Sequence, residues 1–238
     1  MALPLKSAMK KYYPHNPARG KRKTIHLLLY SFIVIPALLL LSGCGAKKKG
    51  PEEAVYMDPG QQRIAAWQTL IEEKFYAPEM EKLEAVNSFF NQLEFVADRD
   101  HWGKEDYWAT PREMLLSNGG DCEDFATAKY FTLRRLDIPD GKMHLTYVKA
   151  LKLQQPHMVL SYYSEPTADP LILDSLVHEI LTASERPDLI PIYSFNGQGL
   201  WLSKKQQSHR LGESEGLSLW QELQHRFSQE AIAGPLPE

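Results

Sequence analysis

The stretch Gly119–Ala126, with the sequence GGDCEDFA, constrains the fold and the chemistry of this chain more than any other part of it. Two glycines interrupt the chain, and a run without Gly or Pro then continues to Asp137, with apolar residues near helical spacing. This pattern predicts a helix that starts at about Asp121, with that aspartate as its N-cap. Cys122 would then lie in the first turn, where the positive end of the helix dipole favours a thiolate.

Three carboxylates crowd the predicted position of this sulfur, namely those of Asp121, Glu123 and Asp124. Alone they would oppose ionisation of Cys122, because neighbouring negative charges raise the pKa of a thiol. A hard cation bound by these carboxylates would remove the conflict, and calcium takes oxygen ligands of this kind. The stretch therefore predicts a nucleophilic cysteine beside a calcium site formed by Asp121, Glu123 and Asp124.

The N-terminal segment has the pattern of an export signal. Residues 1–23 are basic, and an uncharged, mostly apolar run over 24–43 leads to Cys44. The ending Leu-Ser-Gly-Cys resembles a bacterial lipobox, which implies that Cys44 is lipidated, that it anchors the chain to a membrane and that the protein is sorted to the outer membrane. An uncleaved anchor remains an alternative, because the run approaches the roughly 20 residues that span a bilayer. Each alternative places the rest of the chain outside the cytoplasm.

Charge and cysteine content exclude some classes of function. Residues 1–44 carry seven Lys/Arg and no acidic residue, which leaves 20 basic and 30 acidic residues in the remainder. Such an acidic body argues against nucleic-acid binding and is compatible with calcium. The only cysteines are Cys44 and Cys122, which could form one disulfide in an exported protein. We expect separate roles for them instead, as lipid anchor and nucleophile.

We expect three parts, with an export segment over 1–44, a tether over 45–60 and a single domain over 61–238. Within the domain, helical patterns precede a run of strand patterns, which predicts an α+β fold with a meandering antiparallel sheet. The predicted helices cover 61–75, 79–93, 111–117, the stretch after Asp121 and 217–227, and the predicted strands cover 143–151, 157–163, 171–173, 190–195 and 200–202. The segment 98–109 is polar and aromatic, and we expect a surface loop there.

A cysteine nucleophile needs a base that takes its proton and a third group that orients the base. His157 opens one predicted strand and Asp174 closes another, so on neighbouring strands the two side chains would lie side by side. Cysteine at a helix N-terminus, followed by histidine and aspartate on strands, is the order of the papain and transglutaminase class. The backbone N–H of Cys122 is a natural donor to the oxyanion.

The remaining histidines and tryptophans receive structural roles. We expect His101, His144 and His178 to be surface or structural residues. Trp102 and Trp108 are candidates for a second oxyanion donor, but packing is the expected role of both.

Four separated motifs, in the same order, are similar to those of the bacterial transglutaminase-like cysteine proteases of the LapG type. They are GGDCEDFATAKYFTL, HMVLSYY, PLILDSL and DLIPIYSFNGQGLWL, and the similarity covers about 65–202. The resemblance implies a papain/transglutaminase-like fold with Cys122 as nucleophile, His157 as general base and acid, and Asp174 as the orienting carboxylate. It also implies a calcium site at Asp121, Glu123 and Asp124.

The resemblance implies a biological role as well. Proteases of this type act in the periplasm and cut the N-terminal region of very large surface adhesins, which releases the adhesin and lets a biofilm disperse. An inner-membrane receptor for cyclic-di-GMP sequesters the protease when the nucleotide is abundant. The lipobox conflicts with part of this role, because a protein anchored in the outer membrane would have to reach that receptor across the periplasm.

Two other functions remain open at this stage, because a fold and a triad do not fix the substrate or the acceptor. The first is another envelope enzyme with Cys-His-Asp acyl-transfer chemistry, either a peptidoglycan hydrolase or a transglutaminase. The second is a non-catalytic binding lipoprotein in which Cys122 is a buried thiol. HExxH, CxxC, P-loop and GxSxG motifs do not occur in the sequence, so zinc hydrolase, redox and nucleotide chemistry have no support.

Overall fold

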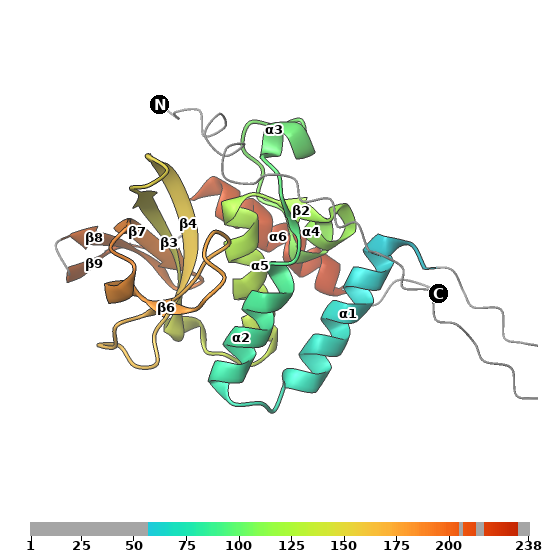
Figure 1. Ribbon diagram of the computed structural model, residues 1–238, viewed down its shortest axis with the longest axis horizontal. Helices are drawn as coiled ribbons and strands as arrows, with labels where there is room; N and C mark the ends of the chain where they lie inside the picture. Colours follow the sequence, from blue (N-terminus) through green and yellow to red (C-terminus); the bar gives the residue numbers. More distant parts are fainter. Residues whose placement is uncertain (1–56, 205–206, 213–216, 233–238) are drawn as a thin grey trace, which may run out of the picture. The chain divides into compact units, whose positions relative to one another are not determined.

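The computed structural model describes residues 57–204, 207–212 and 217–232. The predicted export segment, with Cys44, and most of the tether lie outside this part of the chain. The described residues form helices packed on one face of an antiparallel sheet (Figure 1), which confirms the predicted α+β fold. None of the described helices has the length and apolar character that crossing a membrane would require.

Each predicted helix is present with slightly different ends. The longer helices are α1 (Pro59–Lys74), α2 (Glu79–Phe90), α4 (Pro111–Ser117), α5 (Cys122–Arg135) and α6 (Ser218–Ile232). Helix α1 begins inside the predicted tether, because Asp58 caps it by accepting hydrogen bonds from the backbone N–H groups of Gly60 and Gln61. A short helix, α3 (Asp98–His101), lies in the segment that the sequence predicts to be a loop.

The main sheet has seven strands in the order β6-β5-β4-β3-β7-β8-β9, and neighbouring strands are antiparallel. The strands are β3 (Met143–Ala150), β4 (Gln155–Tyr162), β5 (Leu171–Leu173), β6 (Leu181–Thr182), β7 (Leu189–Asn196), β8 (Gly199–Lys204) and β9 (Gln207–Gly212). The sequence patterns do not predict β6, which has two residues, or β9, whose sequence QSHRLG lacks apolar alternation.

A second, two-stranded parallel pair positions the start of α5. It joins β1 (Glu94–Phe95) to β2 (Gly119–Gly120), directly before Asp121. A Cβ atom at Gly119 would lie 2.6 Å from the carbonyl oxygen of Glu94, so only glycine permits this close approach. The glycines therefore do more than end the preceding helix, because they dock the start of α5 against β1.

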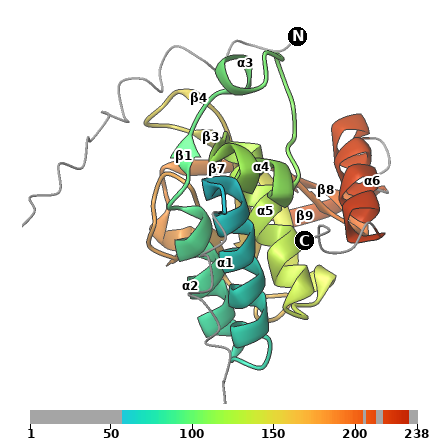
Figure 2. The same ribbon diagram turned by 90° about the vertical axis from the view of Figure 1, so that its right-hand side faces the viewer.

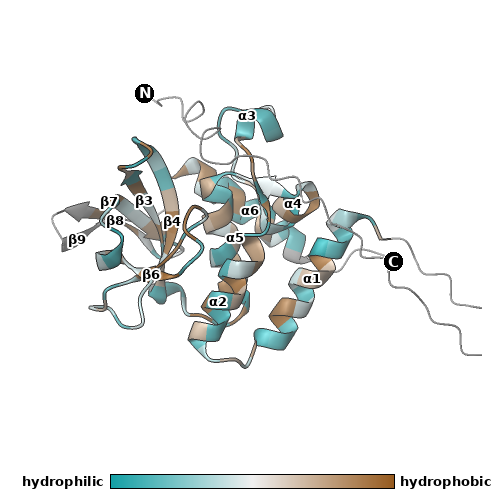
Figure 3. Cartoon of the chain, in the orientation of Figure 1, coloured by the Kyte–Doolittle hydropathy of each residue, from teal (hydrophilic) through white to brown (hydrophobic). Residues whose placement is uncertain are grey.

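Helix α5 is the centre of the core. Its residues from Phe125 to Leu133 are all buried, and it packs on β3 and β4 with α2 and α4 on its other sides (Figure 2). The indole N–H of Trp67 in α1 donates to the hydroxyl of Thr132 in α5, at 2.9 Å. Figure 3 shows apolar and polar residues alternating around α1 and α2, as expected of helices that cover a core on one side.

The opposite face of the sheet carries a smaller apolar cluster, formed by Val148, Val159 and Ile172. These residues alternate along their strands with the residues that face α5, as the pleat of a sheet requires. A groove of about 960 Å³ lies over this cluster, and Arg186 is among the residues that line it.

Trp220 of α6 closes the core beside α5, and its replacement by alanine should destabilise the fold. Its side chain is fully buried, stacks on Phe131 at 5.5 Å between ring centroids and meets Phe195 edge-on at 5.4 Å. We expect Trp220→Ala to lower the free energy of unfolding by about 3–5 kcal/mol, measured by urea denaturation. Gln229→Ala, at an exposed site on the same helix, should change it by less than about 0.5 kcal/mol. Equal effects of the two changes would contradict this placement of α6.

Candidate active site

Cys122 is the first residue of α5, with Asp121 at the N-cap position, as the sequence predicts. The residue is 4% exposed, and its thiol is free. Burial, followed by the charges of Glu123 and Asp121, raises the pKa of this thiol well above its usual range. The thiol donates a hydrogen bond to Oε2 of Glu123 at 3.0 Å. Burial and the neighbouring carboxylates together therefore favour the thiol over the thiolate, which is the conflict that the sequence implies.

His157 and Asp174 lie side by side, as the strand order predicts. His157 belongs to β4, and Asp174 directly follows β5, the neighbouring strand. Nε2 of His157 and Oδ1 of Asp174 are 2.7 Å apart, and both side chains are fully buried. A buried carboxylate in this position fixes the imidazole ring and its tautomer.

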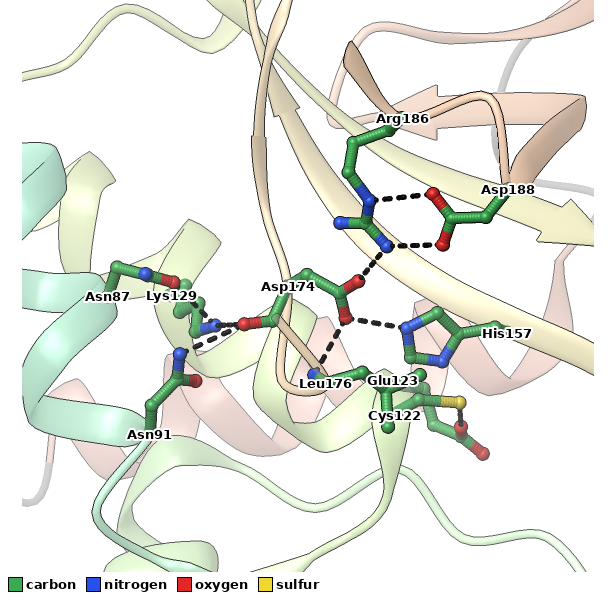
Figure 4. Close-up of polar contacts among 10 residues, drawn as sticks. All are labelled: Asn87, Asn91, Cys122, Glu123, Lys129, His157, Asp174, Leu176, Arg186 and Asp188. Atoms are coloured by element: carbon green, nitrogen blue, oxygen red, sulfur yellow. Dashed lines mark hydrogen bonds and ion pairs between the residues drawn. The ribbon is translucent and has the colours of Figure 1, made fainter. Parts of the chain in front are cut away.

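The other ring nitrogen of His157 is available for the thiol. Among the described residues, Nδ1 is buried and has no hydrogen-bond partner. Figure 4 shows this edge of the imidazole on the side of Cys122, with the Nε2 edge toward Asp174. Turning the thiol from Glu123 to Nδ1 would pair nucleophile and base. This arrangement is compatible with the predicted Cys-His-Asp triad, and the catalytic roles of the three residues stay a prediction.

Asp174 is anchored by groups that no local sequence pattern reveals. The backbone N–H of Leu176 donates to Oδ1 at 3.0 Å, and Nη2 of Arg186 donates to Oδ2 at 2.9 Å. The backbone carbonyl of Asp174 accepts from Nδ2 of Asn91 at 2.9 Å and from Nζ of Lys129 at 3.1 Å (Figure 4). The C-cap residue of α2 and a residue of α5 thereby fix the backbone at this position, while Arg186 fixes the carboxylate.

The pKa of Asp174 lies well below its usual range. Burial opposes its ionisation, but the adjacent His157, the N–H of Leu176 and the guanidinium of Arg186 together outweigh that effect. The carboxylate is therefore charged at neutral pH and accepts the hydrogen bond from His157.

The carboxylates around Cys122 gather with two further acidic residues, Asp98 and Asp106. Carboxylate oxygens of Asp98, Asp121 and Asp124 lie within 4.8 Å of one another. Carboxylate oxygens of Asp98, Asp106 and Glu123 form a second such group, which shares Asp98 with the first. The sequence pattern does not reveal Asp98 and Asp106 as ligands, because the segment 98–109 has the composition of a surface loop. The short helix α3 brings Asp98 inside, where it is 1% exposed.

This acidic cluster has the donor set of a hard cation. Burial first, and then the charges of neighbouring carboxylates, raise the pKa values of Asp121 and Asp124 well above their usual range. Within the described residues, Oδ1 of Asp121 is buried without a hydrogen-bond partner. Crowded carboxylate oxygens of this kind fit calcium, whose charge would lower those pKa values and favour ionisation of the thiol.

Asp124 has a second role in addition to the predicted one. It is fully buried, and its Oδ1 accepts from the backbone N–H of Ala109 at 2.6 Å and its Oδ2 from that of Asp121 at 3.2 Å. These bonds tie the loop before α4 to the first turn of α5. Each carboxylate oxygen has about two lone-pair sites, so the bonds are compatible with a metal ligand, and that role of Asp124 stays a prediction.

The tryptophans and the other histidines have structural contacts. The indole N–H of Trp108 donates to Asp106 at 3.1 Å, and Trp102 packs against His101 and Tyr107. His144 stacks on Trp201 at 4.5 Å between ring centroids, and His178 is exposed. These contacts agree with the packing and surface roles expected of them.

The fold and the site together define a transglutaminase-like cysteine peptidase. Residues 62–207 match the family described as bacterial transglutaminase-like cysteine proteinase BTLCP. The chain belongs to this family, which confirms the resemblance drawn from its motifs. A comparison with curated proteins found no match.

Solved structures of LapG from Legionella pneumophila are similar to this chain. An EGTA-treated form shares 46% sequence identity, covers 72% of this chain and 91% of its own, and superposes with a TM-score of 0.67. A calcium-bound form shares 46% identity over 72% of this chain and 92% of its own, with a TM-score of 0.64. The peptidase fold is therefore shared along nearly the whole length of these relatives.

Lys129 should give the protein a distinctive pH dependence. It is fully buried, and burial lowers its pKa to about 7. An unfolded lysine keeps its proton up to about pH 10.4, so between these values the unfolded state binds more protons and stability rises with pH. We expect the free energy of unfolding of the wild type to rise from pH 7 to pH 9 relative to that of Lys129→Met, in urea denaturation. Parallel pH curves for the two proteins would contradict this prediction.

Proposed function

We propose that this chain is a calcium-dependent endopeptidase of the periplasm that cleaves the N-terminal region of a large surface adhesin and so promotes release from a biofilm. We further propose that an inner-membrane receptor for cyclic-di-GMP inhibits it by sequestration. Membership of the peptidase family supports the class of reaction. The role that the resemblance to LapG-type proteases implies supports the adhesin as substrate and the receptor as inhibitor.

The observation that carries the proposal is the arrangement at the start of α5. A buried cysteine lies between an imidazole held by a charged carboxylate, His157 with Asp174, and a cluster of acidic side chains. The imidazole–carboxylate pair can serve acyl transfer, and the acidic cluster fits a divalent cation. The two together support a metal-dependent thiol peptidase over a binding protein with a buried thiol.

The reaction that follows is acyl transfer to water. The sulfur of Cys122 gives its proton to Nδ1 of His157 and attacks the peptide carbonyl carbon, forming a C–S bond. The backbone N–H of Cys122 donates to the oxyanion, and the imidazolium then protonates the leaving amine as the C–N bond breaks. Water, deprotonated by His157, hydrolyses the thioester and regenerates the thiol.

Calcium would be held by Asp98, Asp106, Asp121 and Glu123, with Asp124 as the remaining predicted ligand. When bound, the ion would supply positive charge that offsets the carboxylates and favours the thiolate. The calcium-bound LapG of Legionella pneumophila, a relative in the same family, supports this assignment for the present chain.

The proposed location depends on the N-terminal sequence. The basic, apolar and small-residue pattern up to Cys44 supports export, and a lipidated Cys44 would keep the enzyme attached to a membrane facing the periplasm. An inner-membrane attachment or a soluble form would place it within reach of the proposed receptor more simply than an outer-membrane one.

The proposed reaction predicts calcium-dependent cutting of one substrate. The purified protein is mixed with the N-terminal fragment of the largest repeat-rich adhesin of the same genome, with calcium, with chelator, and with Cys122→Ala in place of the wild type. We expect a new peptide N-terminus with calcium only, and none with Cys122→Ala, detected by mass spectrometry.

Other results would select among the alternatives. Intact adhesin together with rapid alkylation of Cys122 would reject the adhesin as substrate and keep the enzyme. Ammonia release with amine incorporation would identify a transglutaminase, and new fragments from peptidoglycan would identify a cell-wall hydrolase. An inert thiol and no product would identify a binding lipoprotein.

The proposed ligand set predicts which carboxylates calcium needs. We expect Asp98→Asn and Glu123→Gln each to weaken calcium binding at least about tenfold in titration calorimetry, because each removes a charged oxygen ligand. Asp100→Asn is the matched control, since it removes one negative charge from an exposed site on the same short helix. Equal weakening by the control would show that net charge, and not the cluster, determines the affinity.

A further inference from the structure

We infer that Arg186 is a positioning residue of the peptidase, and that it holds the carboxylate of Asp174 in the orientation that His157 requires. The inference rests on the proposed peptidase activity and deepens it. Arg186 does not touch Cys122 and reaches the triad only through Asp174, from a segment that precedes β7.

The geometry is that of a fixed guanidinium fork. Arg186 is 4% exposed, and Nη2 donates to Oδ2 of Asp174 at 2.9 Å. Asp188, two residues further along, accepts from Nε and from Nη2 at 3.0 Å each. Asp188 thus orients the planar fork in advance, and Arg186 offers its donor to Asp174 with little remaining freedom.

The two oxygens of Asp174 have different partners. Oδ1 faces Nε2 of His157 and the N–H of Leu176, whereas Oδ2 accepts from Arg186. A carboxylate held at both oxygens cannot rotate about its Cβ–Cγ bond without breaking a charge-assisted hydrogen bond. Oδ1 is therefore kept on the line to the imidazole.

This orientation decides which imidazole tautomer is present. With Asp174 ionised and fixed, the proton of neutral His157 belongs on Nε2, and Nδ1 is left to accept the thiol proton of Cys122. Removing Arg186 leaves a fully buried carboxylate without the cation on its Oδ2, which favours its rotation or protonation. Either change weakens the preference for the productive tautomer.

Arg186 is buried but borders a groove, so a chemical rescue experiment can test its role. It lines the groove of about 960 Å³ on the face of the sheet opposite α5, over the cluster of Val148, Val159 and Ile172. We expect truncation of the side chain to alanine to join the vacated space to this groove. Guanidinium from solution should then enter beside Asp174 and replace the missing fork.

The test compares Arg186→Ala and Arg186→Lys with the wild type. We expect Arg186→Ala to lower kcat about 10- to 100-fold, as is typical when a residue that orients a functional side chain is removed, with KM changed less than about twofold. Guanidinium at millimolar, non-denaturing concentration should restore part of that loss in Arg186→Ala and none in the wild type. Arg186→Lys should be intermediate, because an ammonium supplies the charge without the fork.

A substrate-independent measurement accompanies the kinetics. The rate at which iodoacetamide alkylates Cys122 at pH 7 should fall in Arg186→Ala and recover with guanidinium. If the wild type fails to cut the adhesin fragment, the proposed function fails, and the alkylation rates still decide the role of Arg186. Arg63→Ala is the control, since it removes an arginine bonded to the carbonyls of Leu115 and Leu116, away from Asp174.

Three outcomes would overturn the inference. The first is a kcat and an alkylation rate of Arg186→Ala that equal those of the wild type. The second is a loss that guanidinium does not restore, or that Arg63→Ala reproduces, which would show a general structural role. If Arg186→Ala fails to fold, Asp188→Asn is tested in its place. The third outcome is a folded Asp188→Asn variant whose kcat and alkylation rate equal those of the wild type.

Discussion

The burial of the first turn of α5 is the constraint on which the rest of the site depends. That turn carries Cys122, and it is enclosed between β4 and the segment that leads into α4. Asp124 secures it, because its carboxylate accepts backbone N–H groups of Ala109 on one side and of Asp121 on the other. A helix start held in this way keeps a thiol 4% exposed beside the imidazole of His157. The cost is a cluster of carboxylates, of which Asp121 and Asp124 have raised pKa values, around a sulfur whose ionisation the proposed reaction requires.

The site accordingly has two electrostatically different halves. Around Cys122 the described charged neighbours are acidic, and burial together with these carboxylates raises the pKa of the thiol. Around Asp174 the neighbours are basic, with Arg186 at the carboxylate and Lys129 at the backbone carbonyl. In the proposed reaction, calcium bound to the acidic half would favour a negative sulfur, and the basic half favours a negative carboxylate. The imidazole of His157 would then lie between these two negative groups.

The sequence predicts the parts of this site that are local or follow from strand order. The GGDCED stretch locates the helix start and three of the carboxylates, and strand patterns that begin at His157 and end at Asp174 place these two side by side. Asp98 escapes prediction, because only tertiary packing turns a polar segment inward. Arg186 escapes because Arg186-Pro187-Asp188 has the composition of a turn, and nothing local shows that its guanidinium reaches back to β5.

In the fold, too, local sequence patterns predict some elements, and others depend on tertiary packing. Helices α1, α2, α4 and α5 follow from apolar periodicity and from caps, and they lie within a few residues of their predicted bounds. The β1–β2 pair joins residues that are distant in sequence, and β9 pairs with the adjacent strand β8 although its own residues show no apolar alternation. The requirement for glycine at position 119 is visible only when Glu94 lies opposite it, since the interaction is between two backbones.

The two basic residues behind Asp174 are not interchangeable, and their chemistry explains why each stands where it does. Arg186 contacts the carboxylate and stays charged at every relevant pH, so it compensates the buried negative charge permanently. Lys129 is bonded instead to two neutral acceptors, the side-chain oxygen of Asn87 and the carbonyl of Asp174. With its pKa lowered to about 7, a neutral amine can satisfy both acceptors with its two N–H groups. The lysine can therefore lose its charge without disturbing the backbone of Asp174, while the arginine keeps the carboxylate ionised.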